Sequence, residues 1–509
     1  MKINGEQDIL DQKVRAAVIK EILGTENMSR KYEAYKRFMC FKDRTSDFVI
    51  EQLKKQFDDT TVQEMWYCIT NVSIVRKVID KLARVYSNGV TRTITGDESA
   101  TETLSRLSKE LSFNTEIKKT NKFLKLQKNV AMYVKPCAEE NGKYGIKLEP
   151  MNPYLYDVIE NPNKKTEPMV YILSNFQNNP DYYTIGDAAF AGRSSSVQVI
   201  NRGMDGDGVD QSIADSASDA NKGEYIWWSK NYHFTTNEKG EIISSGDGLN
   251  PIKRLPLINF AIEQDGSFWA QGGNDLIDGA ISANSMLTNI KHVAITQGYG
   301  LFWMKGKKVP TNIKVGPNKL IRMEYEDGDP EPSLGFASAN PEIEPMKALV
   351  ETDVALLLTT NNLSTSAVSA SLQGNTDPAS GIAMMLDKAE SREDVEDQRQ
   401  IFLDKEPEIW EAINAWILAY GDNICDELKG LILPPNFEEN FVLKFNDQQV
   451  IQSESEKLDN IKKRKELGLN TKEELILIDN PQLSQDEAKA KAMALEETKP
   501  NADQEDNSQ

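Results

Sequence analysis

One stretch of the chain, residues 354–376, carries no charged side chain. Asp, Glu, Lys and Arg make up 27% of the whole chain, so the gap stands out against its surroundings. Its first part has apolar residues at helical spacing, and its second part is a neutral run of Ser, Thr, Asn and Ala that ends at Asp377-Pro378. The pattern predicts a polar, neutral loop between two long helices. Such a loop suits a surface that touches a charged polymer without gripping it; the alternative is a plain helix connection.

The 509 residues allow several domains, and their charge limits the partners of the chain. Lys and Arg number 59 against 79 Asp and Glu, which gives a net charge of −20 and a pI of about 4.8. A protein that grips DNA needs a basic face that neutralises phosphates. We therefore expect any contact with nucleic acid to be weak, transient or local.

Histidine and cysteine are too sparse for most enzyme or metal chemistry. The four cysteines lie far apart in the sequence without a CxxC pair, which argues against a disulfide framework or a zinc site. The two histidines, His233 and His292, have no partner at ligand spacing. No P-loop, GxSxG or HExxH motif occurs. We expect no catalytic residue, no cofactor and no metal site, and a protein that is not an enzyme.

The sequence predicts no membrane contact. The Met1 end has no apolar signal core, and no run approaches the ~20 apolar residues that span a bilayer. We expect a protein that is made in the cytoplasm.

The order of predicted elements indicates an α+β fold that is mainly helical. Helical periodicity covers much of the first 127 residues, most clearly 71–87. Short β-prone runs broken by Pro, Asn and Gly then predict an antiparallel sheet packed on the helices. The expected strands are 130–135, 145–148, 154–159, 169–174, 224–228 and 232–236. Residues 186–223 are rich in Ser, Gly, Asp and Ala, and we interpret them as a mobile insertion.

Two further apolar helices, 273–297 and 341–361, are predicted on either side of a β-rich segment, 298–340. Small residues in the first helix indicate close approach of a neighbouring helix, or ordinary amphipathic packing. The best strands between the helices are 301–304 and 319–325. Charge is segregated here, with bases before acids, which indicates a docking surface or two solvated hairpin faces. The bases are Lys305, Lys307, Lys308, Lys314, Lys319 and Arg322.

A third, longer helix is expected over 380–420, with a break or kink at Pro407, because proline lacks the amide N–H. A strand at 441–445 and a helical pair between 453 and 478 follow. Three strings mark this order of elements. They are Leu255-Pro256-Leu257-Ile258-Asn259-Phe260 followed by Asn274-Asp275-Leu276-Ile277-Asp278, Ser380-Gly381-Ile382-Ala383-Met384, and Asn470-Thr471-Lys472-Glu473-Glu474-Leu475-Ile476. In their order and spacing, the chain resembles the portal proteins of tailed bacteriophages, particularly the SPP1-like portal family.

The resemblance covers most of the chain and implies a portal fold with wing, stem, clip and crown regions, assembled as a ring that is dodecameric in the family. Residues 1–271 would form the wing. Residues 272–297 and 341–361 would be the two stem helices, and 298–340 the clip. Residues 362–377 would be the tunnel loop, 378–450 the return to the wing, and 451–509 the crown and tail.

The resemblance also implies a function: a channel at one capsid vertex of the virion, through which double-stranded DNA is packaged and ejected without sequence specificity. The expected partners are other copies of the chain, the major capsid protein, the terminase large subunit and a head-completion or adaptor protein. The family has no ATPase activity of its own, in agreement with the missing P-loop. The alternatives are another head–tail connector or capsid scaffold protein and, from a different class, a nucleic-acid-processing enzyme.

Three groups of candidate functional residues follow from this interpretation. The tunnel-loop residues are Leu363, Ser364, Thr365, Val368, Ser369, Leu372 and Gln373, of which the apolar ones would touch DNA. The six bases of the clip would dock an acidic terminase or head-completion protein, or some of them would line the channel. The stem-packing residues are Leu276, Ala280, Ala283, Leu287, Leu349 and Leu357.

Overall fold

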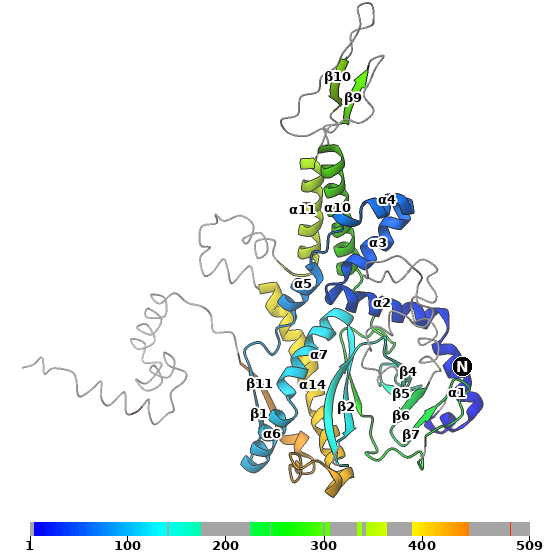
Figure 1. Ribbon diagram of the computed structural model, residues 1–509. Coiled ribbons are helices and arrows are strands. Elements are labelled where there is room, and N and C mark those ends of the chain that lie inside the picture. The colour runs from blue at the N-terminus through cyan, green and yellow to red at the C-terminus, as the bar shows by residue number, and fades with distance from the viewer. Residues whose placement is uncertain are drawn as a thin grey trace, which may run out of the picture. The chain divides into compact units, whose positions relative to one another are not determined.

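A computed structural model of the chain describes residues 5–139, 142–174, 224–244, 246–298, 301–305, 333–337, 343–363 and 389–446, and Lys489 (Figure 1). The chain divides into two units, 1–376 with 387–446, and 377–386 with 447–509. All the helices and strands described below belong to the first unit. The insertion expected at 186–223 and the helices expected beyond 453 lie outside the described residues.

Helices dominate the N-terminal part of the first unit. They are η1 (Glu6–Leu10), α1 (Gln12–Ile22), α2 (Thr25–Phe41), α3 (Thr45–Gln56), α4 (Asp59–Glu64), η2 (Trp66–Cys68), α5 (Ile74–Leu82), α6 (Glu98–Glu110) and α7 (Phe113–Gln127). Aspartates cap three of them: the side chains of Asp11, Asp58 and Asp97 each accept a hydrogen bond from a first-turn amide. The helix predicted over 71–87 is shorter than expected, because the chain leaves helical geometry at Ala83.

Antiparallel strands follow, as the sequence predicts. One sheet has the order β3-β2-β8, from Tyr144–Met151, Asn129–Ala138 and Leu257–Ala261. A second has the order β4-β5-β6-β7, from Tyr156–Glu160, Pro168–Ser174, Tyr225–Ser229 and His233–Thr236. A separate pair joins β1 (Val90–Ile94) to β11 (Phe441–Phe445), and another joins β9 (Leu301–Lys305) to β10 (Ser333–Ala337). The described residues therefore form an α+β structure.

The long helix α14 (Ala389–Tyr420) packs against the three-stranded sheet and α7. Trp416 donates from its indole nitrogen to the backbone oxygen of Val134 at 2.9 Å, and Trp410 stacks on Phe113 at 4.1 Å between ring centroids. Of the break or kink expected at Pro407, the break was wrong, since α14 continues through the proline. Buried residues before and after it hold the helix in place, and this packing outweighs the cost of about 3 kcal/mol of an internal proline.

Three hydrophobic clusters stabilise the unit. The largest joins α2, α6, α7 and α14 to the sheet β3-β2-β8. A second lies among α3, α5 and the helices α10 (Asp275–Gly298) and α11 (Ile343–Thr360). The third packs α1 against β5, β6 and β7. Among the described residues, no helix combines the length and the apolar character needed to cross a bilayer.

A buried ion pair ties α14 to β1. Glu406 is fully buried and accepts hydrogen bonds from the Arg92 guanidinium, from the Tyr86 hydroxyl at 2.7 Å and from the Trp410 indole at 3.4 Å. Arg92 also donates to the side-chain oxygen of Asn114 at 2.8 Å. Burial, and then the negative charge of Glu406, raise the pKa of Tyr86 well above its ordinary value. Since a buried charge is tolerated only when it is paired, each member of this network depends on the others.

Replacing Arg92 by Met should leave the Glu406 carboxyl group buried without its cationic partner. We expect the free energy of unfolding to fall by about 3–5 kcal/mol, measured by chemical denaturation followed by circular dichroism. Lys164→Met is the matched control, because it removes an exposed pair with Glu167 and should cost less than about 1 kcal/mol. Equal, small losses for both variants would contradict a role of the buried pair in holding α14.

Candidate functional site

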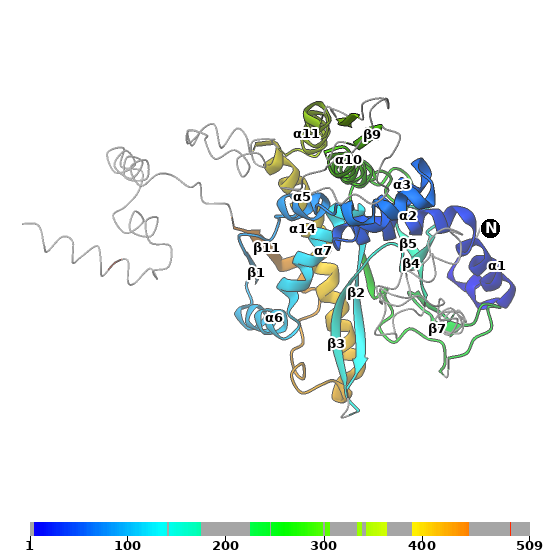
Figure 2. The same ribbon diagram turned by 45° about the horizontal axis from the view of Figure 1, so that its top comes forward.

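The two helices α10 and α11 lie side by side in both views of the structure (Figures 1 and 2). Their bounds are close to the predicted 273–297 and 341–361. Residue 279, near the start of α10, touches Leu357, near the end of α11, so the two helices run antiparallel. The short hairpin β9–β10 comes between them in the chain. We call α10, α11 and this hairpin the paired-helix module.

The contact between the two helices is close because α10 presents a glycine. A Cβ atom at Gly279 would lie 2.7 Å from a methyl carbon of Leu357, which is too near for an unstrained contact. Leu276, Ile277, Ala280 and Leu357 are buried in one hydrophobic cluster around this point. The small residues of α10 therefore allow close helix approach, which was one of the two interpretations of the sequence.

Four of the six predicted stem-packing residues are buried within one chain, and their role in a stem stays a prediction. Leu276, Ala280, Ala283 and Leu357 are buried, and Leu287 is half-buried. Leu349 is different, since its side chain is 54% exposed within one chain. The predicted stem packing includes contact with an adjacent copy, so the role of Leu349 stays a prediction.

α10 also packs on the α3–α5 region, through residues of the same hydrophobic cluster and through hydrogen bonds. Asn284 accepts a hydrogen bond from the Val72 amide at 2.6 Å, and Thr288 accepts one from the Thr70 amide at 3.0 Å. Asn284 also donates to the Ala280 carbonyl at 2.8 Å. The sequence pattern places Asn284 in an apolar stripe, so these bonds were not predicted; its amide side chain within that stripe was the available signal.

One strip of α11 carries no charge along the helix, although exposed Glu344, Lys347 and Glu351 lie elsewhere on its surface. Val350, Leu357 and Leu358 form the buried face. The opposite face, at helical spacing, consists of Pro345, Ala348, Leu349, Thr352, Ala355, Leu356 and Thr359. Leu349 and Leu356 are 54% and 59% exposed. We call these seven residues the neutral face of α11.

Two hydroxyl groups on the neutral face are turned toward the helix itself. The Thr352 hydroxyl donates to the Ala348 carbonyl at 2.8 Å, and the Thr359 hydroxyl donates to the Ala355 carbonyl at 2.9 Å. Because these bonds satisfy the hydroxyls within the helix, the surface offers little to water. A helix with apolar residues on two opposite faces is typically covered on both faces by other protein surfaces.

The prediction that Leu363 is an exposed tip of the tunnel loop was wrong, because its side chain is only 9% exposed. Asn362 adopts positive φ after the last turn of α11, and the Leu363 amide donates back to the Leu358 carbonyl at 3.0 Å. This is a Schellman termination, in which the residue after the left-handed position packs back on the helix. The string Asn361-Asn362-Leu363 was the available signal. The other tunnel-loop residues, Ser364, Thr365, Val368, Ser369, Leu372 and Gln373, lie outside the described residues.

Only one base of the predicted docking surface can be placed. Lys305 is exposed at the end of β9, opposite Ser333 in β10. Lys307, Lys308, Lys314, Lys319 and Arg322 lie outside the described residues, as does the strand expected at 319–325. The partner of β9 is the segment 333–337, which lies in the region predicted to be β-rich but was not among its best predicted strands.

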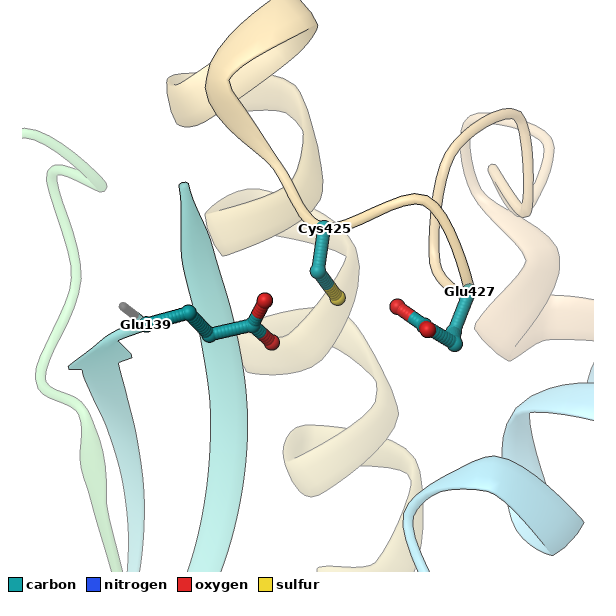
Figure 3. Close-up of side chains that lie close together, drawn as sticks. All are labelled: Glu139, Cys425 and Glu427. Atoms are coloured by element: carbon teal, nitrogen blue, oxygen red, sulfur yellow. The ribbon is translucent and has the colours of Figure 1, made fainter. Parts of the chain in front are cut away.

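One group of side chains has the donor atoms of a metal site. Glu139, Cys425 and Glu427 bring their oxygen and sulfur atoms within 4.8 Å of one another (Figure 3). The carboxylates point toward the Cys425 sulfur from β2 on one side and from the loop after α14 on the other. The wide spacing of the cysteines in the sequence argued against such a site, but spacing along the chain does not limit neighbours that are joined through a sheet.

Comparison with known proteins finds no family model and no curated protein that matches this chain. Its possible roles therefore depend on the geometry of the paired-helix module and on its sequence.

Replacing Gly279 by Val tests the close contact of the two helices. The added methyl groups would overlap Leu357, and we expect a loss of about 1–3 kcal/mol in the free energy of unfolding. Thermal and chemical denaturation would measure it. Gly246→Ala is the control, since a Cβ there meets no atom within 4 Å, and its unfolding should change by less than about 0.5 kcal/mol.

Proposed function

We propose that the chain is a portal-type subunit. Identical copies would close into a ring at one vertex of a virus capsid, and double-stranded DNA would pass through the central channel without sequence-specific binding. The chain would act as a channel and docking platform and not as an enzyme. Its partners would be other copies of itself, the major capsid protein, a terminase that supplies the motor, and a head-completion or adaptor protein.

The neutral face of α11 is the observation that supports this proposal most. In a chain with 79 acidic residues and 59 basic residues, a solvent-facing helix side would ordinarily carry charge. This side has none over 18 residues, or about 27 Å of helix. Exposed leucines on such a face favour contact with another protein surface. A second copy of the chain is the partner that a ring requires.

A second group of exposed apolar residues supports a head-to-tail contact. Trp66, Tyr67 and Val72 are exposed in the stretch between α4 and α5. This stretch packs on α10 through the hydrogen bonds of Thr70 and Val72. Two different apolar surfaces on one chain suit a heterologous interface. Contacts of that kind generate rings when the rotation closes.

The charge of the chain suits DNA that must move. A net charge of −20 on every copy would surround the channel with negative potential, which keeps a duplex from adhering. A basic lining would create binding wells by releasing counterions, and these would oppose translocation. A neutral segment that starts after α11 could instead contact the duplex through shape complementarity, without binding its phosphates. Val368 and Leu372 are the remaining apolar candidates for that contact, since Leu363 is buried.

The mass and symmetry of the purified particle test the proposal directly. We expect native mass spectrometry to give an integer multiple of the 57.2 kDa chain and negative-stain images to show a ring with a hole wide enough for a duplex. Replacing both Leu349 and Leu356 by Glu should leave folded monomers, because charge would enter the apolar contact. Leu418→Glu is the matched control, since Leu418 is 58% exposed on α14 and its loss should leave the particle intact.

A wild-type protein that remains a monomer, or forms a compact particle without a hole, would overturn the portal proposal. Intact rings from the Leu349 and Leu356 double variant would reject the neutral face of α11 as the contact. A ring that assembles but never associates with a terminase or with packaged DNA would favour another head–tail connector.

Replacing Val368 and Leu372 by Asp tests the contact with DNA. We expect rings of normal mass but strongly reduced packaging, because negative charge at the narrowest point would repel phosphates. The measurement is the amount of nuclease-protected DNA in capsids that contain the variant ring. Val368→Thr with Leu372→Gln keeps the segment neutral and should package normally. Normal packaging by the Asp variant would show that these residues do not touch DNA.

A further inference from the structure

The pattern Cys-x-Glu occurs at two places that the fold brings together. Cys137-Ala138-Glu139 lies at the end of β2, and Cys425-Asp426-Glu427 lies in the loop after α14. The two segments are far apart in the sequence. Each offers one sulfur and one carboxylate, which together make a four-donor set of the kind that binds zinc.

Several contacts hold the two segments in register. The Cys425 amide donates to the Tyr144 carbonyl at 2.9 Å, and Tyr144 forms a parallel bridge with Ile424. The Tyr144 ring stacks on Tyr420 with 4.2 Å between centroids. Lys143 pairs with Asp426 at 2.5 Å. The loop is thus fixed against the β2–β3 hairpin by backbone, aromatic and ionic contacts before any ligand is considered.

The donor atoms of three residues already surround one point. Glu139, Cys425 and Glu427 have ligand atoms within 4.8 Å of one another (Figure 3). Around a tetrahedral zinc ion, sulfur and oxygen ligands lie about 3.6 Å apart, given bonds of about 2.3 and 2.1 Å. Side-chain rotations that bring the ligand atoms about 1 Å closer would therefore complete the arrangement. Cys425 is 4% exposed, so its sulfur is held in place by the protein.

Cys137 borders the same space. Gly145 is its partner in the β2–β3 pairing. A Cβ at Gly145 would lie 3.0 Å from a carboxylate oxygen of Glu139 and 3.4 Å from the Cys137 sulfur. The absence of a side chain at 145 leaves room in which these two donor atoms can meet. Cys137 is half-buried, and it is the nearest candidate for a fourth ligand.

Negative side chains gather at this point. Glu139 and Glu427 lie within 4.8 Å of the Cys425 sulfur, and Glu139 also lies beside Cys137. Lys143 is paired with Asp426, which lies outside the donor set. Carboxylates crowded in this way gain from a divalent ion, which also lowers the pKa of the thiols that bind it.

We propose that Glu139, Cys425 and Glu427, completed by Cys137, bind a zinc-type divalent cation. Thiolate ligands favour zinc and cobalt over magnesium or calcium, which prefer oxygen alone. Each cysteine that binds releases its thiol proton to solvent, so the affinity should rise with pH. The ion would fasten the loop after α14 to the end of β2. This site is independent of the proposed channel and does not require a ring.

Cobalt titration of the full, reduced chain tests the proposal. We expect one equivalent of Co²⁺ to give a thiolate-to-metal absorption band with the visible spectrum of a tetrahedral site, and zinc to displace it. Cys425→Ser should abolish the band, and Cys137→Ser should weaken it by about half. Glu427 is exposed, so Glu427→Gln should fold normally and lower the cobalt affinity by at least about 100-fold, given that even outer-shell changes cost 10- to 100-fold.

Two control variants keep the result specific. Asp426→Asn removes the neighbouring carboxylate and Cys68→Ser removes a distant thiol, and both should bind cobalt within about twofold of the wild type. The proposal is overturned if the reduced wild type shows no thiolate band, or if the band persists in Cys425→Ser. Equal loss of affinity in Asp426→Asn and Glu427→Gln would also overturn it, because it would indicate binding to exposed acidic groups in general.

Discussion

The paired-helix module depends on close packing of α10 against α11, and one contact between them falls where α10 lacks a side chain. Gly279 provides that point, and Leu357 fills it. Once this contact is made, the inner faces of both helices are buried in one cluster with α3 and α5. The orientation of α11 is then fixed, and so is the direction of its opposite face. The exposed leucines Leu349 and Leu356 are therefore a consequence of packing that is already complete within one chain.

The part of the charge-free stretch that the structure describes has two physical origins. From Val354 to Leu363 the residues belong to α11 and its termination, where neutrality reflects a buried face on one side and the neutral face on the other. The Schellman turn at Asn362 ends this part and draws Leu363 into the core. The rest of the charge-free stretch, 364–376, lies outside the described residues.

The sequence predicts the helices and strands of this fold better than the tertiary contacts between them. The helices at α10 and α11 are found within two residues, because long apolar periodicity is a local property. The pairing of β1 with β11 joins Val90 to Phe445, and no local pattern specifies that choice. Pro407 is a similar case, since its local preference is overcome by the burial of neighbouring residues in α14. The convergence of Cys137 and Cys425 likewise depends on β3 lying between their segments, which spacing alone does not encode.

Strongly acidic copies need an interface whose binding free energy depends little on charge. In the proposed ring, each copy would carry a net charge of −20, so neighbouring copies would repel one another at distances within the Debye length, about 8–10 Å in ordinary salt. Acidic residues directly across an interface would add a larger and less screened penalty. An interface built on the neutral face of α11 avoids this repulsion between facing acidic residues. Burying Leu349 and Leu356 there supplies a short-range hydrophobic attraction that salt does not weaken. Stability that rises with ionic strength is therefore the signature expected of this assembly, in contrast to one held by salt bridges.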